Sequence, residues 1–186
     1  MSNDNNLVIR TATLNDAQAI LDIYTPYIMN TAITFEFDPI PLEAFKERMK
    51  KVMSKYPWLV CELEGKVIGY AYASMYRERA AFNWDCECSV YIAEEAHRKG
   101  IATILYTKLF EYLKLQGLYN IYAFITYPHD SSIQLHKKFG FTEVGIFKKT
   151  GYKMGKWWDL IVMEKVLRPF EGEPEQLKTY SEIMEM

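Results

Sequence analysis

Residues 86–113 read CECSVYIAEEAHRKGIATILYTKLFEYL, and this stretch decides the fold. The β-branched and aromatic residues at 88–92 predict a strand, and the polar and charged residues at 93–99 predict a loop. From Gly100 onward the apolar side chains recur in steps of three and four, which predicts a helix. The apolar positions of that helix are Ile101, Ile104, Leu105, Leu109, Tyr112 and Leu113. The stretch therefore predicts a strand, a loop and a helix in direct succession.

The entrance of this helix, HRKGIA at 97–102, has the properties of an anion site. The first N–H groups of a helix have no partner within the helix, and the helix dipole adds positive charge there. Gly100 and Ala102 let a phosphate approach the backbone, and Arg98 and Lys99 add charge. A glycine turn with solvated basic residues has the same sequence, so both interpretations stay open. The glycine motifs of phosphate-loop NTPases and dinucleotide-binding folds are absent.

Composition narrows the class of protein. The chain has 186 residues and a net charge of −2, which predicts one domain and no general attraction to nucleic acid or membranes. No apolar run approaches the ~20 residues that span a bilayer, and residues 1–10 lack a signal-peptide pattern. Three cysteines without a disulfide pattern favour a reduced, cytoplasmic protein. Aromatic residues make up 15%, which indicates either an aromatic-lined cleft or interface or a tyrosine-rich core.

The remaining elements follow from periodicity and turn residues. In chain order the sequence predicts a strand, two helices, three strands, a helix, a strand, a helix and two strands. Pro26 is expected to kink or end the first helix, and Gly117 to end the third. This order predicts one α/β domain over residues 1–168, with parallel pairing across the central strand–helix–strand unit of a mixed sheet. The acidic tail 169–186 is expected to be mobile or to pack on a partner.

Several of these motifs resemble the GNAT superfamily of acyl-CoA N-acyltransferases. The family's V-x-I strand motif is matched at 90–92, its glycine loop at 97–102, and its helix ending in Gly-Phe at Gly140 and Phe141. The sequence is more closely similar to the phosphinothricin N-acetyltransferase branch, through YPWLV at 56–60, GYAYA at 69–73, LYT at 105–107 and GYKMGKWWD at 151–159. The resemblance implies a GNAT-like mixed sheet with flanking helices and splayed central parallel strands.

The resemblance also implies that acetyl-CoA is the co-substrate. The pyrophosphate is then expected at the N–H groups of 100–102, and the pantetheine along 90–92. The residues implied in binding are Val90, Tyr91, Ile92, His97, Arg98, Lys99, Gly100, Ile101, Ala102 and His129. His97 replaces the usual Gln or Arg, and His129 stands where the branch often has Asn. No metal is expected, because the C-x-C spacing of Cys86 and Cys88 suits tetrahedral zinc poorly.

Two residues are candidates for acid–base chemistry. Amide formation needs a neutral amine, so a general base is useful, and the resemblance implies that Glu87 has this role. A carboxylate in a surface ion pair is the alternative. His136 is the candidate acid for the leaving thiolate, because the branch has histidine where many relatives have tyrosine. A packed histidine on the inner face of the helix is the alternative.

The acceptor side rests on the loop at 76–83. The resemblance implies that Arg77 and Arg79 bind the anionic end of an amino-acid acceptor, although two solvated arginines would read the same. The candidate walls of the acceptor cleft are Phe35, Glu36, Trp84 and Tyr91. The acceptor classes implied are phosphinothricin, methionine sulfoximine and methionine sulfone. Peptide or protein N-termini, and a non-catalytic acyl-CoA-binding module, remain alternatives. The branch is commonly dimeric, so a homodimer is expected.

Overall fold

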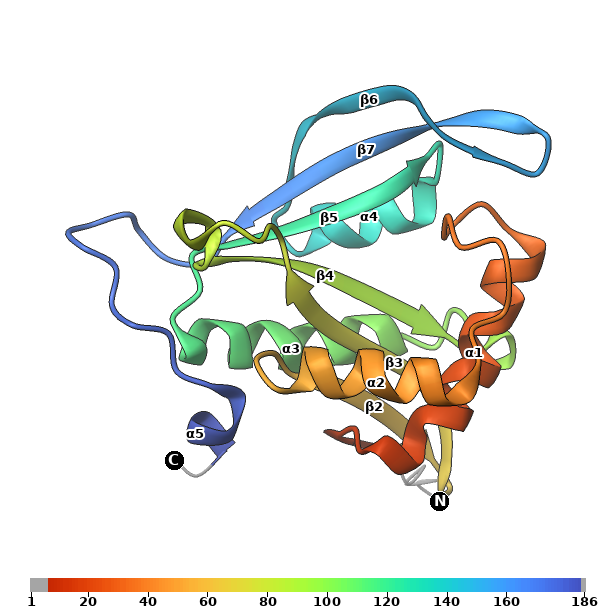
Figure 1. Ribbon diagram of the computed structural model, residues 1–186, viewed down its shortest axis with the longest axis horizontal. Coiled ribbons are helices and arrows are strands. Elements are labelled where there is room, and N and C mark those ends of the chain that lie inside the picture. Colours follow the sequence, from red (N-terminus) through yellow and green to blue (C-terminus); the bar gives the residue numbers. More distant parts are fainter. Residues whose placement is uncertain (1–6, 185–186) are drawn as a thin grey trace, which may run out of the picture.

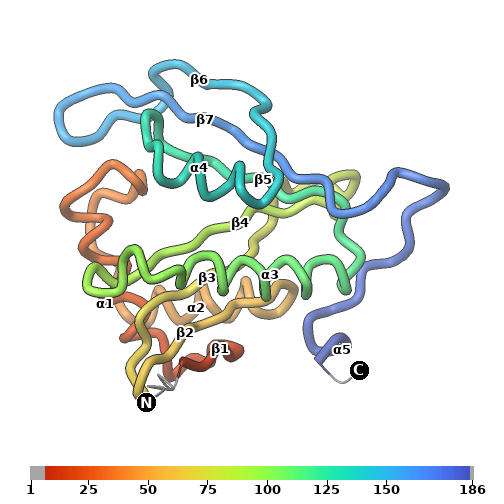
Figure 2. The backbone as a smooth tube through the Cα atoms, turned by 180° about the vertical axis from the view of Figure 1, so that it is seen from behind, coloured from red at the N-terminus to blue at the C-terminus, as the bar shows by residue number. Residues whose placement is uncertain are grey.

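The computed structural model describes residues 7–184, which form a seven-stranded mixed sheet with helices on both faces (Figures 1 and 2). The expectation about a signal peptide falls largely on residues 1–6, which lie outside the described range. The strands are β1 Leu7–Thr11, β2 Trp58–Leu63, β3 Lys66–Met75, β4 Asp85–Ile92, β5 Asn120–Tyr127, β6 Thr142–Lys153 and β7 Lys156–Val166. The helices are α1 Ala17–Asn30, α2 Leu42–Met53, α3 Ile101–Gln116, α4 Asp130–Lys138 and α5 Tyr180–Met184. Short 3-10 turns are η1 Leu14–Asp16, η2 Ala80–Phe82 and η3 Glu94–Ala96.

The sheet order β1-β2-β3-β4-β5-β7-β6 makes the central pair β4 and β5 parallel, as predicted. These two strands pair only at their first residues, and within residues 7–184 the last matched pair is Glu87 with Tyr122. Beyond that pair β4 turns toward α1 while β5 continues along β7, so the sheet opens like a fork (Figure 1). The predicted splay of the central strands is confirmed. Helices α1 and α2 cover one face, and α3 and α4 lie on the other (Figures 1 and 2).

Helix α3 has the boundaries that its glycines predict. Gly100 precedes it with φ +78° and Gly117 follows it with φ +100°, both in the left-handed region that glycine adopts at little cost. Its periodic apolar residues Leu105, Leu109 and Leu113 are fully buried against the sheet. Burying a leucine side chain is worth roughly 1.5–3 kcal/mol, so this face fixes the helix on the sheet and fixes its N-terminus beside β4.

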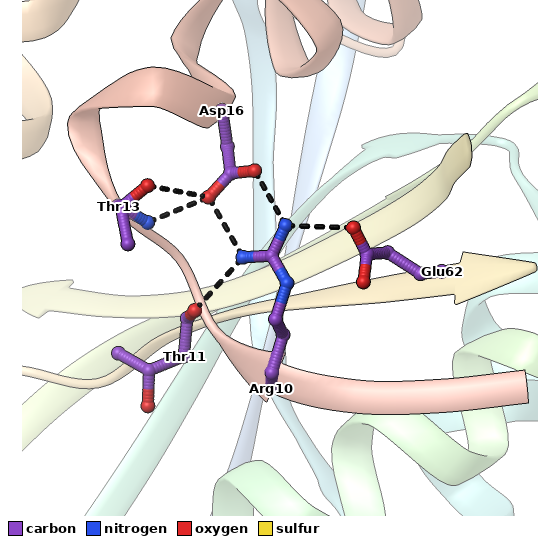
Figure 3. A network of polar contacts seen from close by, with 5 residues as sticks. All are labelled: Arg10, Thr11, Thr13, Asp16 and Glu62. Atoms are coloured by element: carbon purple, nitrogen blue, oxygen red, sulfur yellow. Dashed lines mark hydrogen bonds and ion pairs between the residues drawn. The ribbon is translucent and has the colours of Figure 1, made fainter. Parts of the chain in front are cut away.

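A polar network ties the first strand to the start of α1 (Figure 3). The Arg10 guanidinium donates to both carboxylate oxygens of Asp16, at 2.6 and 2.8 Å, and to Glu62 on β2 at 2.8 Å. Asp16 also accepts from the backbone N–H and hydroxyl of Thr13. The Arg10 hydrogen bonds hold the pKa of Asp16 below its usual value. The network therefore fixes the direction in which the chain leaves β1 and enters α1.

Two regions differ from the sequence prediction. Helix α1 runs through Pro26 to Asn30, so of the two expected effects of Pro26, a kink or an end, the end is excluded. The tail, expected to be mobile or bound to a partner, packs on its own chain as far as residue 184. Gln116 of α3 donates to the carbonyl of Lys178 at 3.0 Å, and the Tyr180 and Thr11 hydroxyls lie 2.6 Å apart. The tail also contains the short helix α5, which was not among the elements expected from the sequence.

Candidate active site at the strand fork

A cleft of about 570 Å³ lies where β4 and β5 separate. Its walls come from the second half of β4, the loop and first turns of α3, the second half of β5 and the start of α4. The predicted residues that line it are Val90, Tyr91, Ile92, His97, Arg98, Gly100, Ile101, Ala102, His129 and His136. Lys99, on the same loop, is exposed and is not part of the lining. The structure thus brings together nearly all of the residues predicted at the acyl-CoA end.

The loop before α3 is held in place by its histidine. His97 Nε2 lies 2.9 Å from the Tyr27 hydroxyl and 3.0 Å from the carbonyl of Ile92. The Tyr27 hydroxyl itself donates to the Ile92 carbonyl at 2.6 Å. The His97 side chain therefore joins this loop to α1 and to the end of β4. The left-handed Arg98, with φ +62°, and Gly100 then turn the backbone into the first turn of α3, where N–H groups are free to bind an anion.

Glu87 occupies the point of the fork. It is the last β4 residue paired with β5, and it shares a face of the strand with Ser89 and Tyr91. Burial raises the pKa of its carboxyl to about 7. Within residues 7–184 it makes no ion pair, so the alternative of a surface salt bridge finds no partner there. A carboxyl with a pKa near 7 is suited to proton transfer at neutral pH.

His136 lies on α4, on the sheet face opposite to α1 and α2, and is only 3% exposed. Its Nδ1 lies 2.7 Å from the carbonyl of Ser132, which can only accept, so Nδ1 carries the hydrogen. Burial lowers the pKa of His136, which keeps the ring neutral. Its Nε2 then accepts from the Tyr106 hydroxyl, 3.2 Å away. His136 is therefore both packed, as the alternative reading held, and at the wall of the cleft.

The segment after α1 closes the other side of the fork. Thr126 of β5 donates to the carbonyl of Ala32 at 2.6 Å, and buried Lys153 of β6 donates to the carbonyl of Thr34 at 2.7 Å. Phe35 packs so tightly on Gly151 that a Cβ there would lie 2.4 Å from its ring. Glu36 pairs with Arg48 of α2 at 2.8 Å. Phe35 and Glu36 are thus held beside the fork, although neither lines the cleft itself.

The predicted acceptor residues of the loop at 76–84 separate into two locations. Arg77 is exposed, with its guanidinium carbon 4.9 Å from the ring centre of Tyr76 and 5.2 Å from that of Phe82. Arg79 is exposed directly before η2. Trp84 lies elsewhere: its indole N–H donates to the carbonyl of Glu175 at 2.8 Å, beside a second cavity at the tail. The structure does not bring the Trp84 side chain to the fork. Its indole N–H is held by the tail instead.

The sequence matches the acetyltransferase (GNAT) domain family over residues 9–162. The chain belongs to the GNAT acetyltransferase family. It is 36% identical over 152 residues to the phosphinothricin N-acetyltransferase of Streptomyces viridochromogenes, covering 82% of this chain and 83% of the relative. It is 33% identical over 171 residues to the L-methionine sulfoximine/L-methionine sulfone acetyltransferase of Pseudomonas aeruginosa, covering 89% and 98%.

A solved structure supports the same conclusion. The phosphinothricin acetyltransferase of Sinorhizobium meliloti, crystallised with acetyl-CoA, superimposes with a TM-score of 0.88 at 34% identity, covering 91% of this chain and 93% of that one. The GNAT-like mixed sheet is confirmed, and the chain is an acyltransferase. Within residues 7–184 no helix is long and apolar enough to cross a membrane. In the same range no three metal-ligand side chains come together.

Sequence reasoning missed several residues at the fork. Tyr106 on α3 and Ser132 on α4 contact His136, and Tyr122 on β5 is the neighbour of Glu87. The contacts of Tyr106 and Tyr122 join elements that are far apart in the chain, whereas Ser132 and His136 lie one turn apart on α4. Tyr106 carried a weak signal, since it is a polar residue at a buried helical position. Ser132 could have been found from its i, i+4 spacing to His136. Tyr122 had no signal, because the pairing of β4 with β5 sets which side chains meet.

Proposed function

We propose that this chain transfers the acetyl group of acetyl-CoA directly to the α-amine of a small amino acid or analogue, with Glu87 as general base. The observation that carries the proposal is the position of the half-buried Glu87 carboxyl at the point where β4 and β5 part, where burial raises its pKa to about 7. The names of the two relatives, which act on phosphinothricin and on methionine sulfoximine or sulfone, support the acceptor class. The catalytic domain of this proposal spans residues 1–168.

In this proposal acetyl-CoA lies along the fork. Its pyrophosphate meets the first N–H groups of α3 at 100–102, with Arg98 beside it, and its pantetheine runs along Val90–Ile92 of β4. The unpaired edge of β4 supports this placement, because its backbone groups face the cleft rather than a neighbouring strand. The Sinorhizobium meliloti relative, crystallised with acetyl-CoA, has the same fold.

Gly100→Val should weaken acetyl-CoA binding at least tenfold, or about 1.4 kcal/mol. A valine strains the left-handed backbone at φ +78° and places two methyl groups at the anion site. Calorimetric titration with acetyl-CoA measures the change, and Gly65→Val, at another left-handed glycine in the β2–β3 turn, is the matched control. Equal affinity in the two variants would rule out this placement.

The proposed chemistry needs two proton movements. Glu87 takes one proton from the acceptor ammonium, the neutral nitrogen bonds to the thioester carbonyl carbon, and the carbon–sulfur bond breaks. The second proton that the nitrogen loses as the amide forms passes to the departing thiolate through the Tyr106 hydroxyl, which accepts one proton as it gives up another and is positioned by the Nε2 of neutral His136. A covalent route through cysteine is disfavoured, because burial raises the pKa of the Cys88 thiol to about 12 and keeps it protonated.

The raised pKa of Glu87 sets a pH dependence. A base works only when ionised, so kcat should rise tenfold per pH unit below about 7 and level off above it. If Glu87 had an ordinary glutamate pKa of about 4.3, the pH range over which kcat rises would lie almost three pH units lower. A profile of kcat between pH 5 and 9, at saturating acetyl-CoA and acceptor, measures the position of the limb. A flat profile down to pH 5 would contradict the assignment of Glu87 as the base.

The experiment that tests the function is thiol release from acetyl-CoA with a panel of amines. The proposal expects release to depend on an added amino acid, with methionine sulfone, methionine sulfoximine and phosphinothricin among the acceptors, and the product to be the N-acetyl amino acid by mass spectrometry. Exclusive use of peptide N-termini would favour the peptide alternative. Tight acetyl-CoA binding without release for any amine would favour a non-catalytic acyl-CoA-binding module.

We further propose that the protein works in the cytoplasm. Cys61, Cys86 and Cys88 are all free and buried. Cys61 lies on β2 while the other two lie on β4, and the thiols serve as small apolar groups of the core. A protein that keeps three free thiols fits a reducing compartment.

A homodimer is the expected assembly. Four large apolar side chains of β6 and β7 are 51–59% exposed, and β6 is an unpaired sheet edge in the described chain. These residues are Val144, Phe147, Tyr152 and Trp157. Symmetric dimers are the commonest way to cover such a surface.

Light scattering at micromolar concentration should give twice the 21.9 kDa chain mass. Trp157→Asp should shift this to the monomer and Leu115→Asp, on exposed α3, should not.

A further inference from the structure

The motif GYKMGKWWD at 151–159 has no part in the proposed acyl-CoA site or in the proton transfers. None of these residues, all of which the structure describes, lines the cleft. They form the end of β6, a tight turn and the start of β7. This hairpin reaches the end of α1 and the chain that follows it (Figures 1 and 2). We call residues 31–36, which follow α1, the wall segment, and the motif packs directly against it.

The wall segment lies on the same face of the sheet as the Glu87 side chain. Glu87 shares its face of β4 with Tyr91, whose ring centre lies 4.8 Å from that of Tyr24 on α1. This is the face that α1 covers, whereas α3, to which the pyrophosphate is assigned, lies on the other face (Figures 1 and 2). Ile33 of the wall segment lines the cleft. An acceptor that reaches Glu87 from this face therefore meets the wall segment.

Side-chain contacts, rather than a backbone ladder, hold the wall segment. Residues 31–36 lie outside the helices and strands of the described chain. The Lys153 ammonium donates to the carbonyl of Thr34 at 2.7 Å and to the carbonyl of Ile28 at 2.7 Å. One side chain of β6 thus joins the last turn of α1 to the middle of the wall segment. Loss of this side chain would release both carbonyls at once.

The environment of Lys153 is unusual for a lysine. The residue is only 4% exposed, and within residues 7–184 it forms no ion pair with a carboxylate. Burying a cation without an opposite charge is costly, and such local conflicts are typical of functional positions. The carbonyl of Ile28 belongs to the last turn of α1, where the helix dipole is negative and offsets part of this cost. The arrangement therefore points to a positional role for Lys153.

Two other residues of the motif shape β6 around this contact. Gly151 leaves room for the ring of Phe35, because a Cβ there would lie 2.4 Å from the ring. The Asp159 carboxylate accepts from the backbone N–H of Lys149 at 2.8 Å, within the irregular stretch where the pairing of β6 with β7 shifts between Phe147 and Gly151. A bulge of this kind re-aims the side chains that follow it. The motif thus directs the end of β6 at the wall segment.

We propose that the motif at 151–159 clamps the wall segment, and that Lys153 is a positioning residue for the acceptor. Lys153 itself lies outside the cleft and acts through the wall segment, which places Ile33 at the cleft on the Glu87 face. A wall held in place before the acceptor arrives saves the free energy of ordering it on binding. Once the acceptor is bound it faces the same base, so loss of the clamp raises KM more than it lowers kcat. This inference rests on the proposed acetyl transfer and adds a residue to it.

Lys153→Met tests the clamp, because it keeps the length of the side chain and removes both hydrogen bonds. With L-methionine sulfone as acceptor and saturating acetyl-CoA, initial rates of thiol release should show a KM at least tenfold higher and a kcat within about threefold of wild type. The affinity for acetyl-CoA by calorimetric titration should stay within twofold. Gly151→Ala disturbs the wall segment through Phe35 instead and should give the same pattern.

Two matched controls separate the clamp from a general effect on the hairpin. Lys165→Met removes another hydrogen bond from a lysine to a backbone carbonyl, that of Phe139 at 2.7 Å, but on β7 and away from the wall segment. Gly145→Ala adds the same methyl group to β6 at a position with no neighbour within 4 Å. Both variants should keep the acceptor KM within twofold of wild type.

Hydrogen–deuterium exchange gives a readout that needs no turnover. The amides of residues 31–36 should exchange at least tenfold faster in Lys153→Met than in the wild-type protein, and those of α3 should not change. If Lys153→Met and Gly151→Ala fail to fold, Tyr24→Phe decides. It removes a buried hydroxyl that lies 2.7 Å from the hydroxyl of Thr34, and it should raise the acceptor KM about threefold.

The outcomes separate this inference from the proposed function. An unchanged acceptor KM in folded Lys153→Met overturns the clamp while leaving acetyl transfer intact. Equal losses of acceptor and acetyl-CoA affinity, or an equal rise of KM in Lys165→Met, also overturn it, because they are the results of a general structural role. If the wild-type protein releases no thiol with any amine, the proposed function fails and the acceptor role of Lys153 fails with it.

Discussion

Glu87→Gln should lower kcat by about 100-fold or more and leave the affinity for acetyl-CoA nearly unchanged. The amide keeps the shape of the side chain at the point of the fork but cannot accept a proton from the acceptor amine. The rise of kcat with pH through about 7 should disappear with the carboxyl that causes it. Initial rates of thiol release from acetyl-CoA give kcat, and calorimetric titration gives the affinity for acetyl-CoA.

The effect of Glu87→Gln on stability separates a catalytic role of this carboxyl from a structural one. Because burial raises the pKa of Glu87, the folded protein holds its proton more tightly than the unfolded chain, so the stability contribution falls as pH rises from about 4 to about 7. Removing the charge should therefore keep or raise the melting temperature at pH 8. Asp85→Asn is the matched control, since Asp85 lies on the same strand and burial also raises its pKa. Wild-type turnover in Glu87→Gln across the pH range would leave Glu87 a structural residue only.

The central strand, loop and helix could be predicted because their information is local. Helix α3 has its apolar residues at regular spacing and a glycine at each end, and the structure begins and ends it there. The loop at 97–102, which leads into this helix, belongs to the same short segment. Residues predicted by resemblance at 90–92 and 97–102 also meet in one cleft, apart from Lys99, because β4 and α3 adjoin in the chain. Local pattern therefore suffices for the acyl-CoA end of the site.

The acceptor end depends on contacts between distant segments, which a single sequence does not display. Trp84 directly precedes β4 and was expected beside the cleft, yet the tail captures its indole N–H. The acidic tail was expected to be mobile or to pack on a partner, because no local pattern marks residues such as Tyr180 that anchor it to its own chain. Likewise, Tyr122 becomes the neighbour of Glu87 only through the parallel register of β4 and β5. Such placements follow from sheet pairing rather than from any motif.

The exposed arginines of the loop at 76–84 provide the second large effect. Arg77→Ala or Arg79→Ala should each raise the KM for an amino-acid acceptor by roughly tenfold or more. A zwitterionic acceptor needs a cation for its carboxylate while its amine faces Glu87, and a charge-assisted hydrogen bond is worth about 1.5–3 kcal/mol. Arg77 is already oriented by the rings of Tyr76 and Phe82, so its loss should have the larger effect. Initial-rate kinetics at saturating acetyl-CoA measure each KM.

Three comparisons make this result specific to the carboxylate. The affinity for acetyl-CoA should change less than twofold, because the pyrophosphate is assigned to the other end of the cleft. An acceptor amide, which lacks the anion, should be a poor substrate whose KM is indifferent to both changes. Arg168→Ala is the matched control, since Arg168 also lies over a tyrosine ring, Tyr119 at 5.4 Å, but sits directly before the tail and donates to the carbonyl of Lys114 on α3. If both loop variants kept the wild-type KM for the best amino acid, or if polyamines or arylamines were better acceptors than any amino acid, the acceptor assignment would be wrong even though the acetyltransferase fold stands.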